Sequence, residues 1–278
     1  MLDSAIRRTP RPQDAARMGT QELRDAFLAA GLFVPGSLNG IFTDLDRLVV
    51  GGACPLGAPL ELPNHRETGR GFFLEQRELG AINIGGAGAV HVDGRTFKAG
   101  RLDCVYVPVG ARSVAFESAD PGDPARFYFL SCPAHAAHPA ALMRPKEASP
   151  VALGVAATAN KRTIYKFIHE GGIQSCQLVM GFTALDDGSV WNSFPPHTHN
   201  RRCEIYLYFD LGDRALVHFM GEPAATRHLF VHNEQAVLSP PWSIHCGCGF
   251  GNYKFIWGMA GENRTFDDMD PVAPLDMR

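Results

Sequence analysis

The chain has 278 residues, of which 45% are hydrophobic and 20% are charged, and its formal net charge at pH 7 is −3. These values are ordinary for a globular protein, and the lack of a basic field argues against nucleic acid or an anionic membrane as partner, which favours a small molecule. The odd number of scattered cysteines predicts no disulfide framework. No apolar run reaches the roughly 18–20 residues of a membrane helix. The N-terminus lacks the apolar segment of a secretory signal, so we expect a cytoplasmic protein.

The N-terminal segment, residues 1–35, is expected to be helical over residues 20–30. Thr20 can cap this helix, Leu23 and Phe27 share one face, and Gly31 is expected to end it. After this segment, 29 Gly and 20 Pro residues in the whole chain punctuate short apolar runs, which is typical of an all-β protein with a few short helices. The Ala- and Pro-rich stretch 133–147 allows one further short helix.

Two β-rich blocks follow, which we assign to domains at residues 36–150 and 151–278. In the first, Val90 and Val92 alternate with a polar residue, and Asp93-Gly94 predicts a tight hairpin turn. The segment EQAVLSPPWSIHCGCG of the second block parallels GRLDCVYVPVGARSVAF of the first: a strand, a proline, a short turn and another strand. This repetition predicts a duplicated antiparallel barrel.

The second block contains a set of potential metal ligands. Residues i and i+2 of a strand point to the same face, so His197 and His199 project together. Glu204 can return on the next strand as a third ligand, and His245 follows Pro240-Pro241 at the matching place of the last hairpin. Three imidazoles and one carboxylate suit Zn, Fe, Mn or Ni, so the ligands do not select the metal.

Two other clusters contain residue types that can bind a metal or form a redox pair. Cys246 and Cys248 form a C-x-C pair, but they stand in a Gly-rich stretch without a second cysteine pair, so turn residues are the favoured interpretation. Asp267, Asp268 and Asp270 are acidic neighbours near the C-terminus. Because no further ligand pattern accompanies them, we favour a turn or a subunit contact.

The ligand pattern resembles a known motif pair. HTHNRRCEIYLYFDLG is similar to the first cupin motif, and SPPWSIHCG is similar to the second. The resemblance implies two cupin barrels (double-stranded β-helix, or jelly-roll) with one divalent metal at the mouth of the second. The first block carries no H-x-H, and His91 is isolated in it, so we expect no metal there.

A longer resemblance covers roughly residues 20–278. VDGRTFKAG, KRTIYK, SPPWSIHCG and FIWGMAGENRTFDDMDPV are similar to the 5-dehydro-4-deoxyuronate isomerase family (4-deoxy-L-threo-5-hexosulose-uronate ketol-isomerases). The resemblance implies an enzyme of pectin breakdown that contains zinc and forms hexamers. It also implies the reaction, which converts 4-deoxy-L-threo-5-hexosulose uronate into 3-deoxy-D-glycero-2,5-hexodiulosonate. It carries the metal ligands over to His197, His199, Glu204 and His245, all of which are present.

Such a reaction needs a Lewis acid and a proton shuttle, and no redox cofactor. Tyr206 follows Glu204 at strand spacing, so it is our candidate for proton transfer or for hydrogen bonding to the substrate. Lys166, Arg162 or Arg202 could meet the substrate carboxylate. Two other functions remain open: a mononuclear iron dioxygenase, and a non-catalytic cupin that binds a sugar acid.

Overall fold

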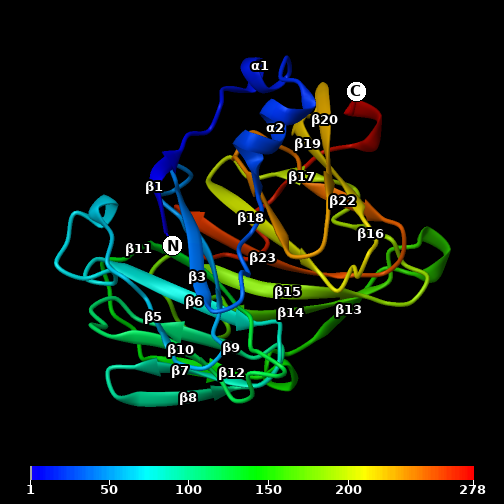
Figure 1. Ribbon diagram of the computed structural model, residues 1–278. Coiled ribbons are helices and arrows are strands. Elements are labelled where there is room, and N and C mark those ends of the chain that lie inside the picture. The colour runs from blue at the N-terminus through cyan, green and yellow to red at the C-terminus, as the bar shows by residue number, and fades with distance from the viewer. Residues whose placement is uncertain (1) are drawn as a thin grey trace. The chain divides into compact units, whose positions relative to one another are not determined.

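The computed structural model describes residues 2–278, and its regular structure consists mostly of strands, as the sequence predicts (Figure 1). The chain forms two compact units. Unit 1 contains the N-terminal residues through Arg7, Gly31–Ser149 and Lys166–Met180, and unit 2 contains Arg8–Ala30, Pro150–Tyr165 and Gly181–Arg278. Each unit therefore takes a segment from the other half of the sequence.

Unit 1 is made of a seven-stranded sheet and a four-stranded sheet. The larger sheet has the order β1 (Leu2–Arg7), β3 (Ser37–Thr43), β4 (Val49–Cys54), β11 (Phe127–Pro133), β6 (Arg77–Asn83), β9 (Cys104–Val107) and β12 (Ala141–Met143). The smaller sheet has the order β5 (Leu60–Glu61), β10 (Val114–Ser118), β7 (Gly88–Val92) and β8 (Arg95–Ala99). The strands pair antiparallel, except that β1 runs parallel to β3.

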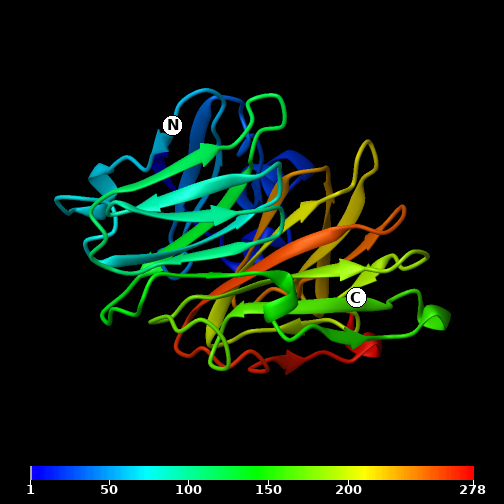
Figure 2. The ribbon, with the colours of Figure 1, turned by 90° about the horizontal axis from the view of Figure 1, so that it is seen from below.

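A second pair of sheets with seven and four strands belongs mostly to unit 2, since parts of β14 and β15 are counted in unit 1. The larger one has the order β13 (Val151–Leu153), β14 (Arg162–Ile168), β15 (Val179–Leu185), β23 (Lys254–Gly261), β18 (Arg202–Phe209), β21 (Gln235–Ser239) and β2 (Leu28–Ala29). The smaller one has the order β16 (Trp191–Asn192), β22 (Cys246–Gly249), β19 (Leu216–Glu222) and β20 (Ala225–Val231). A separate short pair joins β17 (His197–Thr198) to β24 (Asp270–Pro271), the red strand of Figure 2.

The two larger sheets share one topology. The order β3-β4-β11-β6-β9 in unit 1 has the same sequence of connections as β14-β15-β23-β18-β21 in unit 2, and the two four-stranded sheets correspond in the same way. The predicted hairpin is part of this plan. Val92 pairs with Arg95, and Asp93 and Gly94 between them both have positive φ, as a tight two-residue turn requires.

The helices are short, and no helix among the described residues has the length and apolar character to cross a membrane. α1 spans Pro12–Ala15 and α2 spans Thr20–Phe27, and both lie in unit 2 beside β19 and β20 (Figure 1). The predicted cap was wrong: Gly19 caps α2, and its N–H donates to the Glu22 carboxylate at 2.7 Å. The helix also ends before Gly31, because Leu28 is already extended and pairs with Val237 of β21.

The Ala- and Pro-rich stretch 133–147 does not form the helix that its composition allows. Residues Ala141–Met143 pair with β9 as strand β12, and only one 3₁₀ turn, η2 (Pro145–Glu147), follows. The other 3₁₀ turns are η1 (Arg66–Thr68), η3 (Ala156–Thr158) and η4 (Pro274–Asp276). Pro139 and Pro145 within the stretch explain this outcome, because a proline disfavours helical backbone at the residue before it.

The two barrel interiors differ in chemistry. Unit 1 is filled by apolar side chains, among which Phe116 lies 5.3 Å from Phe127 and 5.8 Å from Phe129 between ring centroids. In unit 2, Tyr208 is fully buried and its hydroxyl lies 2.8 Å from Nδ1 of the buried His218. A buried polar group is costly unless it is hydrogen-bonded, so this interior is specified by a polar network as well as by packing.

Candidate metal centre

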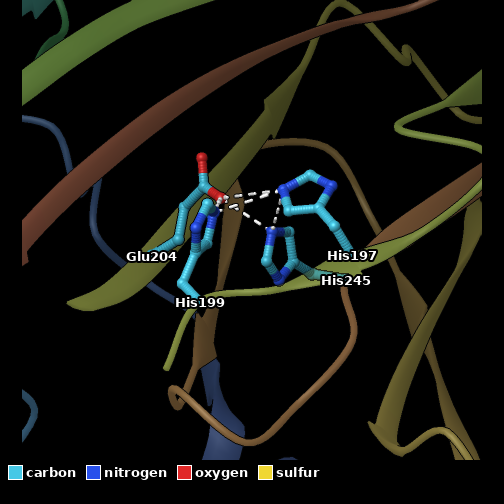
Figure 3. A group of neighbouring side chains, drawn as sticks. All are labelled: His197, His199, Glu204 and His245. Carbon is cyan, nitrogen blue, oxygen red and sulfur yellow. Dashed lines mark hydrogen bonds and ion pairs between the residues drawn. The ribbon is translucent and has the colours of Figure 1, made fainter. Parts of the chain in front are cut away.

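The four predicted ligands converge at one point in unit 2 (Figure 3). His197 lies on β17, Glu204 lies near the start of β18, His199 stands in the turn between these strands, and His245 directly precedes β22. The side chains turn toward a common centre, and their ligand atoms all lie within 4.8 Å of one another. The structure therefore brings together the whole predicted set.

The separations between these ligand atoms fit one shared ion. His197 Nε2 is 3.2 Å from His199 Nε2, which is 3.0 Å from Glu204 Oε2. Glu204 Oε2 is 2.7 Å from His245 Nε2, which is 2.9 Å from His197 Nε2. Ligand bonds of about 2.1 Å place ligands at right angles about 3.0 Å apart, and tetrahedral ligands about 3.4 Å apart. The cluster can hold a metal ion, and its edges are closer to the right-angle value.

Burial sets the charge states that a metal ligand needs. His199, Glu204 and His245 are buried. Burial, together with the neighbouring His245, lowers the pKa of His197 to about 2, so this imidazole is neutral. Burial favours the protonated form of Glu204, but the adjacent imidazoles of His245 and His199 outweigh it and hold the carboxyl pKa below its usual range. A neutral imidazole and an ionised carboxylate are the forms that bind metal.

Outer hydrogen bonds orient two of the imidazoles. Nδ1 of His199 lies 2.8 Å from the carbonyl oxygen of Asp268, which can only accept, so Nδ1 carries the proton and Nε2 presents its lone pair to the centre. Nδ1 of His245 lies 3.1 Å from the Ser239 hydroxyl and 3.4 Å from the Ser243 carbonyl oxygen. These contacts fix which nitrogen faces the cluster.

The segment that supplies the Asp268 carbonyl is tied down by two arginines. We call residues 263–272 the C-terminal clasp, which includes β24. The Arg201 guanidinium pairs with the carboxylates of Asp268 and Asp270, and Asp270 also accepts the Asn200 N–H. Hydrogen bonds from Arg201 and then from Asn263 hold the pKa of the Asp268 carboxyl below its usual range. Asp268 and Asp270 therefore hold the C-terminal clasp against the turn that precedes β18 in the same chain.

Cys246 and Cys248 are both free thiols on β22. Neither belongs to the group of potential ligands found among the described residues. Burial raises the pKa of Cys246 to about 12, so its thiol is protonated and suited to packing.

A cavity of about 300 Å³ opens beside the cluster. It is lined by apolar and aromatic side chains together with a few polar groups, which is the usual composition of a small-molecule site. The lining includes the ligands His197, His199 and Glu204, and also Arg162, Ser193, Tyr206, Trp257 and Asp267.

Two of the predicted site residues lie in this lining. The half-buried Arg162 donates to the Asn160 carbonyl oxygen at 2.8 Å, and burial lowers its pKa although Tyr206 partly offsets this effect. No carboxylate among the described residues pairs with it. Tyr206 is buried, and its hydroxyl lies 3.0 Å from that of Ser193. Burial, followed by the Glu204 charge, raises the pKa of Tyr206 well above its usual value, so the phenol is protonated.

The other two predicted substrate residues are placed differently. Arg202 is fully buried and donates to the carbonyl oxygens of Thr265, Phe266 and Asp268, so it holds the C-terminal clasp. Lys166 is half-buried on β14. Neither residue is part of the cavity lining.

Sequence reasoning did not single out Ser193 or the pairing of Arg201 with the clasp. Ser193 carries no motif of its own. Arg201 stands beside the metal-binding motif, and Asp268 belongs to a group of aspartates without a ligand pattern. The two residues are 67 positions apart, so only the fold shows that they form an ion pair.

Proteins of known sequence are similar to this chain over nearly its full length. The model of the KduI/IolB family matches residues 52–272. The 4-deoxy-L-threo-5-hexosulose-uronate ketol-isomerase of Opitutus terrae is 53% identical over 272 residues, which cover 97% of this chain and 98% of the relative. The ketol-isomerase of the same name from Escherichia coli O9:H4 is 46% identical over 276 residues, which cover 98% and 99%.

Solved structures establish the fold. An IolB-like protein from Salmonella typhimurium LT2 superposes with a TM-score of 0.72 at 16% identity, over 88% of this chain and 96% of that one. An oxalate decarboxylase from Bacillus subtilis has a TM-score of 0.54 at 11% identity, over 79% and 70%. These neighbours confirm the predicted cupin architecture. The family model covers most of the sequence and the relatives align over nearly its full length, so the chain belongs to the KduI/IolB family.

Proposed function

We propose that this protein isomerises 4-deoxy-L-threo-5-hexosulose uronate to 3-deoxy-D-glycero-2,5-hexodiulosonate in the breakdown of pectin-derived uronates. The names of the full-length relatives support this substrate. The observation that carries the proposal is the buried cluster of three imidazoles and one carboxylate, which opens on a cavity lined by Arg162, whose guanidinium has no acidic partner among the described residues. A metal site beside an arginine that can bind a carboxylate suits a keto sugar acid as substrate.

We assign one divalent ion per chain to His197, His199, Glu204 and His245, and zinc is the metal that the family resemblance favours. When bound, such an ion acts as a Lewis acid toward neighbouring carbonyl and hydroxyl oxygens and stabilises the negative charge that develops on them. A hexameric assembly, which the family resemblance implies, and a cytoplasmic location, which the sequence leads us to expect, remain predictions.

Arg162 is our candidate for binding the substrate carboxylate. Its guanidinium lines the cavity and lacks an acidic partner among the described residues, so a carboxylate would complete its hydrogen bonding. An arginine can bind a carboxylate through two parallel N–H donors, which fixes orientation as well as position. This contact would place the sugar chain along the cavity, toward the metal ligands.

Tyr206 is our candidate for the group that acts on a substrate oxygen. Its phenol is protonated and hydrogen-bonded to Ser193, so it can donate a hydrogen bond where negative charge develops. Proton transfer between the two carbons also needs a base. The raised pKa of Tyr206 disfavours the phenolate, so we assign hydrogen bonding to Tyr206 and leave the carbon base unassigned.

The first test compares turnover with and without oxygen. We expect protein with about one metal ion per chain to form the 2,5-diketo product at the same rate under argon as in air, because a ketol isomerisation has no net redox change. Product would be followed by NMR, and oxygen uptake with an electrode. A rate that required oxygen, with stoichiometric uptake, would support the iron dioxygenase instead.

Replacing a ligand should remove metal and activity together. In His245→Ala we expect the metal content, measured by elemental analysis, to fall close to zero and kcat/KM to drop by at least about 100-fold, since even outer-sphere changes weaken metal sites by 10- to 100-fold. The exposed His232 offers a matched control as His232→Ala. Wild-type turnover by a correctly folded His245→Ala protein would refute the metal mechanism.

Arg162 and Tyr206 should give opposite kinetic signatures. We expect Arg162→Ala mainly to raise KM, by about tenfold or more, because it removes a charge-assisted contact made in the ground state. We expect Tyr206→Phe mainly to lower kcat, by about 10- to 100-fold, with metal content unchanged. Steady-state kinetics with metal analysis separates the two, and an unchanged kcat for Tyr206→Phe would remove this residue from the mechanism.

Loosening the C-terminal clasp should lower the affinity for the metal, although no metal ligand is replaced. Arg201→Ala breaks the pairs with Asp268 and Asp270, so we expect His199 to be less well oriented and metal affinity to fall by about tenfold, with partial rescue in Arg201→Lys. Competition with a chelator measures this affinity. Lys254→Ala, which breaks a half-buried ion pair with Asp210 in the same unit, is the control. Equal affinities in both variants would show that the clasp does not orient His199.

A further inference from the structure

Unit 1 has a cavity of its own, of about 330 Å³. It lies at one edge of the larger sheet, where β3 and β11 end and β6 begins. Its polar lining includes Arg47, Arg70, Arg77, Gln76 and His135, and its apolar lining includes Phe42 and Pro133. The volume is that of a small-molecule pocket. Three guanidinium groups around one cavity of this size give it a strongly cationic character.

Arg77 is the best-defined of these arginines. Its residue is 8% exposed, and its guanidinium donates to the Ser131 hydroxyl at 3.2 Å and to the carbonyl oxygens of Ser131 and Arg47 at 2.7 and 2.5 Å. All these acceptors are neutral. Burial lowers the pKa of Arg77 to about 10, and no carboxylate opposes this shift. A buried cation without an acid is costly, and a bound anion would relieve that cost.

The corresponding arginine of unit 2 shows the contrast. Arg202 begins β18, as Arg77 begins β6, and these strands hold the same place in the two sheet orders. The charges of Glu204 and Asp268 act on Arg202 and counter the effect of its burial. No described carboxylate of unit 1 acts on Arg77 in this way, although the strand order is the same. The missing negative charge is therefore a local property of the unit 1 cavity.

The other two arginines stand on ordered turns. Arg47 lies between β3 and β4 with positive φ, and its carbonyl oxygen is tied to Arg77. The Arg70 carbonyl oxygen accepts from the Asn64 side chain at 2.9 Å. Neither guanidinium has an ion pair among the described residues. The acid in the lining, Glu67, is already paired with Arg66 at 3.0 Å, so the cavity keeps an excess of positive charge.

We propose that this cavity binds the oxyanion group of a small hydroxylated metabolite, a carboxylate or a phosphate. Arg77 would meet the anion at the buried end, and Arg47 and Arg70 would close on it from the exposed side through charge-assisted hydrogen bonds. Gln76 and His135 supply neutral polar groups for hydroxyls. The site lies within unit 1 and is independent of the metal centre and of the function proposed for it.

The test titrates the metal-loaded full-length protein with D-galacturonate, inorganic phosphate and uncharged D-galactose by calorimetry. We expect saturable binding of galacturonate, phosphate or both, and none of galactose; the stronger of the two anions identifies the preferred group. Arg47→Ala and Arg70→Ala should each weaken this binding by about tenfold or more. The exposed Arg95, outside the cavity in unit 1, gives the control Arg95→Ala, which should bind like the wild type.

Arg162→Ala separates this site from the cavity of the metal centre, and it should leave the binding intact. The Arg47 and Arg70 variants should also retain their metal content and circular dichroism spectrum. The proposal is overturned if neither anion binds saturably at millimolar concentration, if binding survives both Arg47→Ala and Arg70→Ala, or if it disappears in Arg162→Ala. The last outcome would place the anion beside the metal ligands.

Discussion

The hydrogen bond between His199 and the carbonyl of Asp268 connects the metal cluster to the rest of unit 2. It settles the tautomer of the imidazole, and it lies beside the place where β24 returns to pair with β17. That return is held by the Arg201 ion pairs and by the buried guanidinium of Arg202. The metal ligands come from three separate segments of the chain. Neighbouring residues must hold each segment in place, because a short polar turn has little packing of its own to position a ligand.

The two units share one strand order but differ in the side chains that fill their interiors. Unit 1 is packed with phenylalanine and branched side chains, and Gly51 must lack a side chain because the Phe129 ring lies against its Cα. Unit 2 replaces much of this with tyrosine, histidine and asparagine in a hydrogen-bonded network. Gly247 similarly leaves room for the polar groups of Asn192 and Tyr208. An apolar interior stabilises a barrel by burial, whereas the polar one positions groups at a cost in desolvation.

Charge is distributed to match these interiors. Around the metal cluster, Glu204 and the clasp carboxylates balance the arginines at the start of β18. Arg162 in the cavity lining has no acidic partner among the described residues, and within the same residues Arg77 of unit 1 has none either. Because a buried or half-buried guanidinium seldom stays without a counter-charge, both positions suggest an anionic ligand. The two cavities differ in that only one of them adjoins a set of metal ligands.

The sequence by itself determined the β architecture, its duplication and the members of the metal cluster, because strand periodicity, turn residues and H-x-H spacing act over short distances. It also named Tyr206, from alternation along a strand, and Arg162, as one of three basic candidates, and both of these residues line the cavity. The role of Arg202 depended on tertiary structure: its partners lie more than 60 residues away, and local sequence does not show whether a strand arginine meets a cavity or a carbonyl. The clasp and the end of α2 were decided in the same way, by pairing with distant strands that overrides local preference.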